Sequence, residues 1–264
     1  MPVNRESLKQ LERALHFEGV SFLPECTFVG SDLSQFVIGG ARATSDVEAE
    51  IAPVSSPENA LTSRTNRAAC QLELLYQEAL VCHNCRLSAS RQNVVFGSGN
   101  SESPLICFVG EGPGPDEDVQ GQPFVGPAGI LLTQAIEKGL CLQREDLYLC
   151  NVVKCCPPDK QTPHADEVAS CSHFIEAQLE IIRPKVIVTL GKVALEALCP
   201  DLFAGKSSKK PGIGLLRGQW RDWRGIPLMP TFHPAYLLRT PEKKREFWED
   251  LKSVMAALEI GPRT

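Results

Sequence analysis

The sequence predicts an α/β protein, a three-layer α/β/α sandwich with a central four-stranded parallel sheet. Four short apolar runs alternate with segments whose apolar residues recur at helical spacing. A helix between successive strands brings each strand back parallel to the last, with helices on both faces of the sheet. Continuously apolar runs are typical of strands that are buried on both faces. The predicted strands are 105–110, 147–153, 185–191 and 226–232.

Helices are predicted before, between and after these strands. Pro127 suits the first turn of one helix, and Thr162 and Pro163 suit the cap and first turn of the next. In the first predicted helix, Leu72 and Tyr76 share one face. The predicted helices are 68–81, 127–140, 162–182, 192–198 and 241–257.

The N-terminal quarter is predicted to stand apart from this domain. Residues 3–18 have the leucine spacing of a short amphipathic helix, whereas 40–69 are small, polar and interrupted by proline, as in a linker. We therefore expect an extension over 1–67, poorly ordered or loosely docked, and a domain over 68–264. The first residues are charged, without the apolar core of a signal peptide, and no apolar run is long enough to span a membrane. We expect a cytoplasmic protein, nucleoid-associated in a prokaryote.

The net charge of -5 conceals an uneven distribution. Residues 70–182 hold 6 Lys and Arg against 15 Asp and Glu, whereas residues 183–264 hold 15 against 8. The C-terminal third is therefore a candidate surface for a polyanion, although its charges also suit solvated helix faces.

The chain has 11 cysteines, an odd number that argues against a complete disulfide framework in a cytosolic protein. Cys82 and Cys85 form a C-x2-C pair, and paired cysteines recur at Cys155 and Cys156, with Cys171 beyond. Thiolates at such spacing converge on a metal or a cluster. Spacing alone leaves open iron–sulfur, zinc or a redox dithiol, and Cys155 or Cys156 as the ligand. The remaining cysteines are expected to fill apolar space.

Glycine-rich and polar segments follow the predicted strands, where parallel sheets bind ligands. The segment at 110–129 lacks the G-K-[ST] ending of a phosphate loop and the glycine spacing of a dinucleotide site. Asn151 ends the second strand and His233 follows the fourth. These loops predict a ligand site that is neither a phosphate loop nor a dinucleotide site.

Together these residues resemble the family 4 uracil-DNA glycosylases, the iron–sulfur branch of the uracil-DNA glycosylase superfamily. The resemblance covers roughly 70–257 and leaves the N-terminal segment outside. It is carried by the C-x2-C pair, RQNVVFGSGN (91–100), GEGPG-x2-ED (110–118), GQPFVGPAG (121–129), NVVKC…C (151–171), VIVTLG (186–191) and HPAYLLR…K-x3-WEDL (233–251).

The resemblance implies a repair enzyme that flips uracil out of DNA and hydrolyses its N-glycosidic bond, leaving an abasic site. Phe124 matches the aromatic residue that stacks on uracil, and Asn151 the amide that reads its edge. His233 matches the donor to the departing base. Backbone at Gly110 and Gly112 is implied to contact the base.

A carboxylate that orients water is less well defined. The more active members of the superfamily carry Asp where this chain has Gly112, so Glu111 and Glu117 are the expected substitutes, with Asp118 a weaker candidate. Such a carboxylate could also stabilise an oxocarbenium-like transition state.

The resemblance also implies a [4Fe-4S] cluster held by Cys82, Cys85, Cys155 and Cys171, with a structural role. Leu237 matches the leucine that fills the space left by the flipped base, with Tyr236 and Leu238 as adjacent wedges. Arg239 and Lys243, together with the neighbouring Lys244 and Arg245, would contact phosphates. We expect a monomer that acts on uracil-containing DNA, single- or double-stranded, and not on a membrane.

Three other functions fit parts of this pattern. A non-catalytic nucleic-acid binding protein with a cluster or zinc remains possible because the water-orienting Asp is absent. An electron-transfer protein would leave the GEGPG and HPAYLL loops without a purpose. The cross-linking branch of the superfamily carries a basic insert before its His motif, which MPTFHPAYLL lacks.

Overall fold

The computed structural model describes residues 57–204 and 210–260. The helix predicted at 3–18 and most of the predicted linker lie outside these residues. No helix in the described part of the chain is long and apolar enough to cross a membrane.

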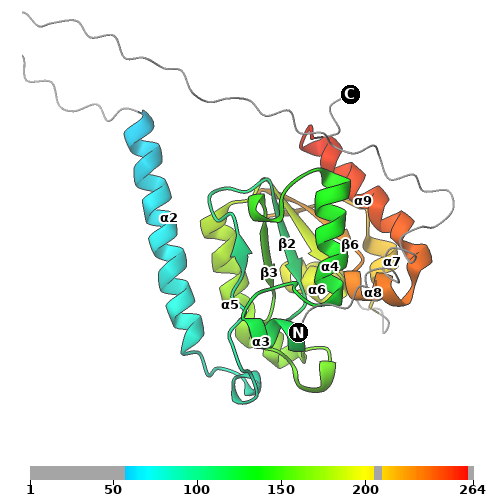
Figure 1. Ribbon diagram of the computed structural model, residues 1–264, viewed down its shortest axis with the longest axis horizontal. Coiled ribbons are helices and arrows are strands. Elements are labelled where there is room, and N and C mark those ends of the chain that lie inside the picture. Colours follow the sequence, from blue (N-terminus) through cyan, green and yellow to red (C-terminus); the bar gives the residue numbers. More distant parts are fainter. Residues whose placement is uncertain (1–56, 205–209, 261–264) are drawn as a thin grey trace, which may run out of the picture.

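A six-stranded sheet forms the centre of the molecule (Figure 1). Its strand order is β1-β3-β2-β4-β6-β5, and the four inner strands are parallel, as predicted. Two antiparallel edge strands extend the predicted sheet, and they are too short for a sequence pattern to reveal. The strands are β1 (Ser98–Gly99), β2 (Ile106–Gly110), β3 (Tyr148–Asn151), β4 (Val186–Leu190), β5 (Arg221–Trp223) and β6 (Ile226–Thr231).

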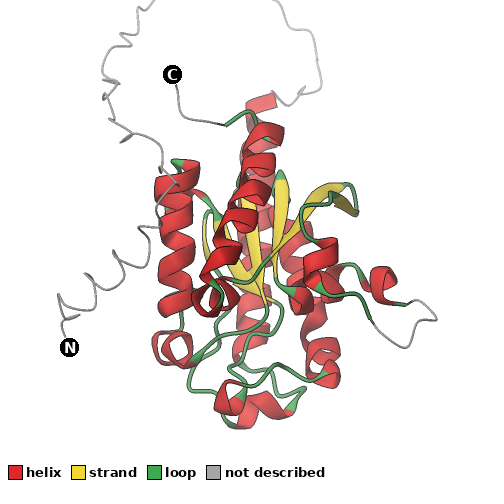
Figure 2. Ribbon diagram, turned by 90° about the vertical axis from the view of Figure 1, so that its right-hand side faces the viewer, coloured by secondary structure: helices red, strands yellow, loops and turns green. Residues whose placement is uncertain are grey.

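Helices cover both faces of the sheet, which gives the predicted three layers (Figure 2). One apolar core joins the sheet to α2, α5 and α6, and the other joins it to α4, α8 and α9. The helices are α2 (Pro57–Leu80), α3 (Pro115–Gln120), α4 (Pro127–Gln134), α5 (Ala165–Ile182), α6 (Lys192–Leu198), α7 (Ile213–Leu216), α8 (Pro234–Arg239) and α9 (Lys244–Ala257).

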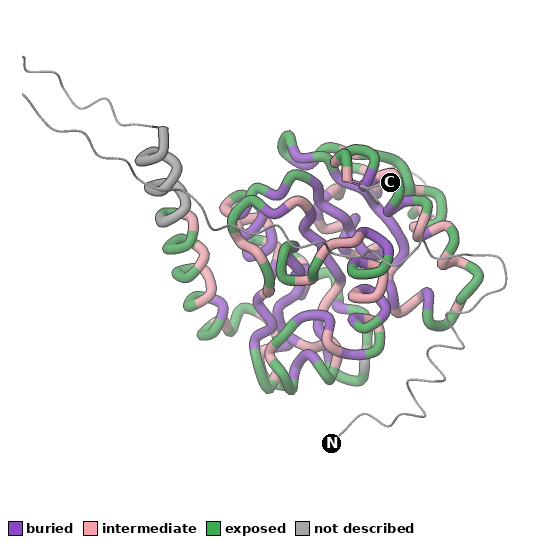
Figure 3. The backbone as a smooth tube through the Cα atoms, turned by 45° about the horizontal axis from the view of Figure 1, so that its top comes forward, coloured by how far each residue is buried: buried purple, intermediate pink, exposed green. Residues whose placement is uncertain are grey.

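The inner strands β2, β3 and β4 are buried along their whole length, as their apolar sequences predict, and β6 is buried except at Pro227 (Figure 3). Successive residues of β2 face opposite cores, so that Cys107 belongs to one and Phe108 to the other. This alternation is the period of two that a strand imposes on its side chains. The sheet is therefore held from both sides, and its strand ends are fixed in position.

Two predicted helix boundaries are wrong. Helix α2 begins at Pro57, not near residue 68, because no glycine or further proline follows within the segment to interrupt it. Helix α5 begins at Ala165, with His164 as its N-cap, and not at Thr162. The side chain of Glu167 accepts the N–H of His164 at 2.7 Å, which caps the helix two residues later than predicted.

Two short helices lie at the carboxyl ends of the parallel strands, where the sequence predicts only loops. Helix α3 follows β2, and α8 follows β6 immediately after His233. The predicted helix over 127–140 consists of α4 and a continuing π-helical turn, Ala135–Leu140. A cleft lies between these elements, at the strand edge where parallel sheets bind ligands.

Candidate active site and cysteine pocket

The cleft has a volume of about 510 Å³. It brings together side chains from the carboxyl ends of β2, β3 and β6 and from the loop 157–163. Its principal polar and aromatic lining residues are Glu111, Glu117, Phe124, Asn151, Thr162, His233 and Arg239. The structure thus gathers into one place most of the site residues that the sequence predicts.

Asn151 closes the inner end of the cleft from the last position of β3. Its side chain is 2% exposed, and its Oδ1 has no hydrogen-bond partner among the described residues. A buried polar oxygen without a partner is unfavourable, by about 1–3 kcal/mol, unless a ligand supplies a donor. The strand end therefore presents a buried acceptor to whatever enters the cleft.

Phe124 lies against this acceptor, and Gly110 makes room for both. A Cβ placed on Gly110 would lie 2.4 Å from Oδ1 of Asn151 and 2.6 Å from Cζ of Phe124. Only glycine permits this close approach of strand and ring. The Phe124 and His233 rings lie 6.4 Å apart between centroids, tilted by 33°. The aromatic face, the amide and the imidazole thus surround one small volume.

Glu117 is engaged with backbone and does not support the expectation that it orients water. Its Oε1 accepts the N–H groups of Val125 and Gly126 at 3.0 and 2.8 Å, and its Oε2 accepts that of Gly114 at 3.0 Å. Asp118 is likewise occupied, because it accepts the N–H groups of Gln92 and Asn93. Both carboxylates hold the loops of the cleft together.

Asp116 also lines the cleft, but among the carboxylates expected to orient water, Glu111 is the one there that is not engaged with backbone. Burial raises its pKa, and a hydrogen bond with Thr162 partly opposes that effect. Gly112 beside it packs closely, since a Cβ there would lie 2.6 Å from a methyl group of Val153. The space beside Gly112 is therefore filled by neighbouring side chains, and Glu111 approaches the cleft from the adjacent position.

His233 is neutral in this environment. Burial lowers its pKa to about 4, and the nearby positive charge of Arg239 adds to the effect. Its Nδ1 accepts the N–H of Ala235 at 3.1 Å, as the N-cap of α8. The ring therefore carries its proton on Nε2, which makes that nitrogen a hydrogen-bond donor.

The exposed leucine of α8 is Leu238, and not Leu237 as predicted. Leu237 is 1% exposed and packs in the core shared by α4 and α9, whereas Leu238 is 42% exposed and lines the cleft. A six-residue helix turns adjacent positions to different sides. The segment HPAYLLR alone could not tell which leucine faces outward.

The predicted phosphate contacts differ in their surroundings. Arg239 lines the cleft, beside Leu238. Lys243 forms an ion pair with Glu246 at 2.6 Å, and this pair raises the pKa of Lys243. Arg245, which is more exposed, lies 3.3 Å from Glu249. Arg239 is thus the cation that belongs to the cleft itself.

The four predicted cysteine ligands line a second, smaller pocket. Cys82 and Cys85 follow α2, Cys155 follows β3, and Cys171 lies within α5. Cys156 does not line this pocket, and its thiol lies against the carbonyl of Pro157. Burial raises the pKa of Cys171 to about 11. Of the two adjacent cysteines, the structure therefore brings Cys155 to the other three.

Two basic side chains accompany this pocket, and the sequence pattern does not single them out. Arg91 Nη1 lies 3.3 Å from the sulfur of Cys155, and it also donates to the carbonyl of Cys82. Lys154 is buried, and its Nζ donates to the carbonyl of Asn151 at 2.6 Å. Lys154 thus connects the cysteine pocket with the buried amide of the cleft. A lysine between an apolar strand and a cysteine pair is the only signal the sequence offers for it.

Comparisons with known proteins identify the family of this chain. The family model of the uracil DNA glycosylase superfamily matches residues 96–252. A type-4 uracil-DNA glycosylase of Thermotoga maritima is 46% identical over 185 residues, which cover 69% of this chain and 91% of the relative. One of Saccharolobus solfataricus is 40% identical, covering 73% of this chain and 89% of the relative.

A type-5 uracil-DNA glycosylase of Pyrobaculum aerophilum is more distant, at 33% identity over 44% of this chain and 54% of the relative. The type-4 relatives are thus matched over a longer stretch and at higher identity. The chain belongs to the uracil-DNA glycosylase superfamily and, within it, to the type-4 uracil-DNA glycosylases.

Proposed function

We propose that the protein excises uracil from DNA by hydrolysing the N-glycosidic bond of deoxyuridine, which releases uracil and leaves an abasic site. The observation that carries this proposal is the buried, unpartnered Oδ1 of Asn151 between Phe124 and His233. DNA repair and glycosidase activity are also what the names of the type-4 relatives indicate.

Asn151 selects uracil by the pattern of donors and acceptors on its side-chain amide. Its Oδ1 accepts N3–H of uracil, and its amide N–H₂ donates to the adjacent carbonyl. Cytosine presents an acceptor and a donor in the reverse order, so it would leave the buried amide mismatched. Phe124 offers its ring for stacking, which replaces the stacking that the base loses on leaving the duplex.

His233 stabilises the base as it departs. Cleavage transfers the electron pair of the glycosidic bond to N1 of uracil, and the negative charge spreads to its carbonyl oxygens. The Nε2–H of the neutral imidazole donates to one such oxygen. A donor fixed in place before the reaction stabilises that charge without reorganisation.

Glu111 acts on the opposite side of the reacting sugar. Its carboxylate orients the attacking water and faces the positive charge that develops on the sugar. Glu117 acts indirectly, because it holds the backbone on either side of the loop that carries Phe124.

Helix α8 engages the DNA around the flipped nucleotide. Leu238 fills the space that the base vacates, and Arg239 contacts a phosphate near it. A wedge of this kind is needed in duplex DNA, whereas single-stranded DNA offers its bases without it. The protein acts as a monomer on both forms.

Cys82, Cys85, Cys155 and Cys171 hold a [4Fe-4S] cluster. Their sulfurs line one pocket, and among the residues the structure describes no three His, Cys, Asp or Glu side chains group tightly enough for a single metal ion. Ligands spread around a pocket suit a cluster better than one zinc ion. These four residues would hold the cluster between α2, the end of β3 and α5, in a structural role, since the hydrolysis needs no electron transfer.

Uracil release from oligonucleotides tests the proposal. The full-length protein, purified without exposure to air, is incubated with DNA containing one uracil, one thymine or one cytosine at the same position. We expect free uracil and an alkali-labile abasic site from the first substrate only. Binding to uracil-containing DNA without any release of uracil at enzyme excess would contradict the proposal.

A further inference from the structure

Phe124 adopts a backbone conformation that a phenylalanine rarely occupies. Its φ is +56°, in the left-handed region, where a side chain with a Cβ is disfavoured. Such a conformation persists only where the surroundings enforce it, and it is common at functional sites. The loop 121–126 must therefore be held by contacts from outside itself.

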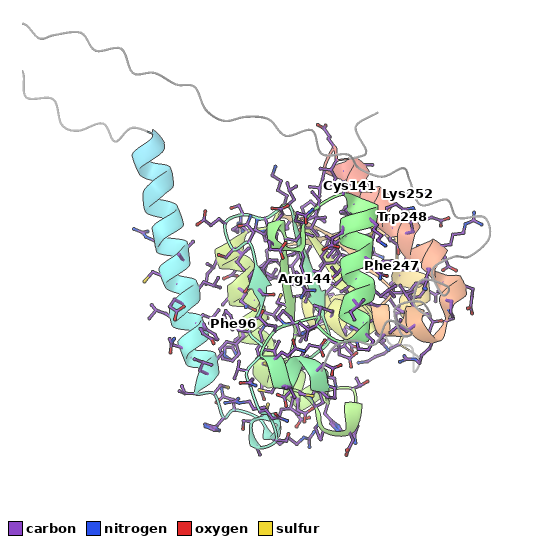
Figure 4. All side chains as sticks on the ribbon, in the orientation of Figure 1. Phe96, Cys141, Arg144, Phe247, Trp248 and Lys252 are labelled. Atoms are coloured by element: carbon purple, nitrogen blue, oxygen red, sulfur yellow. The ribbon has the colours of Figure 1, made fainter. Side chains whose placement is uncertain are left out.

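Arg144 supplies contacts of this kind from the segment that precedes β3. Its guanidinium donates to the carbonyl of Pro123 and, at 2.8 Å, to the carbonyl of Phe124. The same Nη1 donates to Oγ1 of Thr133 on α4 at 3.0 Å. Figure 4 labels Arg144 beside α4. One rigid, planar group thus fixes both carbonyls that flank the Phe124 N–H and ties them to a helix.

Glu117 holds the same loop from its other side. Its carboxylate accepts the two N–H groups that follow Phe124, whereas Arg144 donates to the two carbonyls before and at this residue. Gly129 completes the enclosure, because a Cβ there would lie 1.9 Å from the carbonyl oxygen of Phe124. Phe124 is therefore enclosed between two opposite charges, the carboxylate of Glu117 and the guanidinium of Arg144.

Arg144 does not line the cleft and so does not touch the base. We propose that Arg144 is a positioning residue for uracil recognition, which fixes the Phe124 ring in the stacking position by holding its backbone left-handed. This inference rests on the proposed function, in which Phe124 stacks on uracil. Removing the guanidinium leaves two carbonyls without their donor and allows Phe124 to return to the common negative φ.

The Arg144→Met variant keeps a long apolar stem and removes only the charged donor. Hydrogen bonds to a charged group are worth enough to predict a loss of roughly 10- to 100-fold in uracil excision and in inhibition by free uracil. Affinity for DNA containing an abasic site is expected to stay within about twofold, because phosphate contacts are unaffected. Met255→Ala is the matched control: it truncates a buried side chain of α9 in the same core, and loses stability without changing inhibition by uracil.

A double-mutant cycle separates positioning from a general structural role. In a Phe124→Gly background there is no ring to place and no strain at positive φ. The effect of Arg144→Met on excision is therefore expected to shrink to within about threefold. An undiminished loss in that background would overturn the proposal, as would unchanged uracil inhibition in the single variant.

Amide hydrogen exchange tests whether Arg144 holds the loop 121–126, even if uracil is not the substrate. Without DNA, Arg144→Met should accelerate exchange at Val125 and Gly126, whose N–H groups bond Glu117, and Met255→Ala should not. Unchanged exchange would show that Arg144 does not hold this loop. Accelerated exchange in a chain whose parent releases no uracil would instead refute the proposed function alone.

Discussion

At the scale of single residues, the chemistry depends on side chains whose ordinary behaviour the fold has changed. His233 is an N-cap whose Nδ1 is already occupied by a backbone donor, so only its Nε2–H faces outward. Asn151 keeps one oxygen unpaired inside a buried strand end. The sequence identifies both residues by their motifs, but only the fold explains why each has the protonation or pairing that the reaction needs.

The lowered pKa of His233 predicts an unusual pH dependence. The imidazole should titrate near pH 4 instead of near its ordinary 6.5. The activity should therefore persist through pH 6 without an inflection from this group. Between these values the unfolded chain binds a proton that the folded chain does not, so His233 makes stability fall as pH falls below 6.5.

NMR titration of the imidazole, with His233→Gln to assign its signal, measures this directly. A midpoint for His233 close to that of a free imidazole would show that the ring is charged during part of the working range, contrary to its proposed role.

The two adjacent leucines of α8 predict opposite phenotypes. Leu237→Ala should destabilise the fold by about 2–5 kcal/mol, because it opens a cavity in the core. Leu238→Ala should change stability by less than about 0.5 kcal/mol and lower excision from duplex DNA more than from single strands. Thermal unfolding and excision from both DNA forms check the pair. Equal effects of Leu238→Ala on the two DNA forms would exclude it as the wedge.

At the scale of elements, the strand ends position everything that the proposed reaction uses. Apolar runs and helical spacing are sufficient to predict the four inner strands and their parallel orientation, because both patterns arise from the burial of apolar side chains. The helices α3 and α8 are missed because each is a six-residue helix with no apolar period of its own. The sequence could not choose between Glu111 and Glu117, or between Leu237 and its neighbour Leu238, for the same reason, since short helices decide which side chains face the cleft.

The cysteine pocket gives a prediction at the element scale, with Cys156, which lies outside the pocket, as the matched control. Cys171→Ser should remove iron and sulfide from the purified protein and lower the unfolding temperature, because α5 loses its bond to the rest of the pocket. Cys156→Ser should leave iron, sulfide and visible absorbance unchanged, since its thiol lies outside the pocket. Zinc in place of iron in the parent protein would contradict the proposed cofactor.

At the scale of the whole molecule, one buried side chain connects the cleft with the cysteine pocket. Lys154, which itself lines the cysteine pocket, donates to the carbonyl of Asn151 and to the side chain of Gln178 on α5, the helix that carries Cys171. The basic C-terminal third, visible in the sequence as 15 Lys and Arg against 8 Asp and Glu, carries α8 at the mouth of the cleft. Charge counting locates this region but cannot show that Lys243 is already paired with Glu246.

The excision of uracil by the parent protein and by Asn151→Ala tests the central claim most directly. Single-turnover release is measured on DNA with one uracil, and binding to abasic-site DNA is measured in parallel. Loss of the buried amide should reduce release by roughly 10²- to 10³-fold, because both hydrogen bonds to the base edge disappear, with binding to abasic DNA retained. Release within twofold of the parent would contradict the assignment of this strand end as the site that reads uracil.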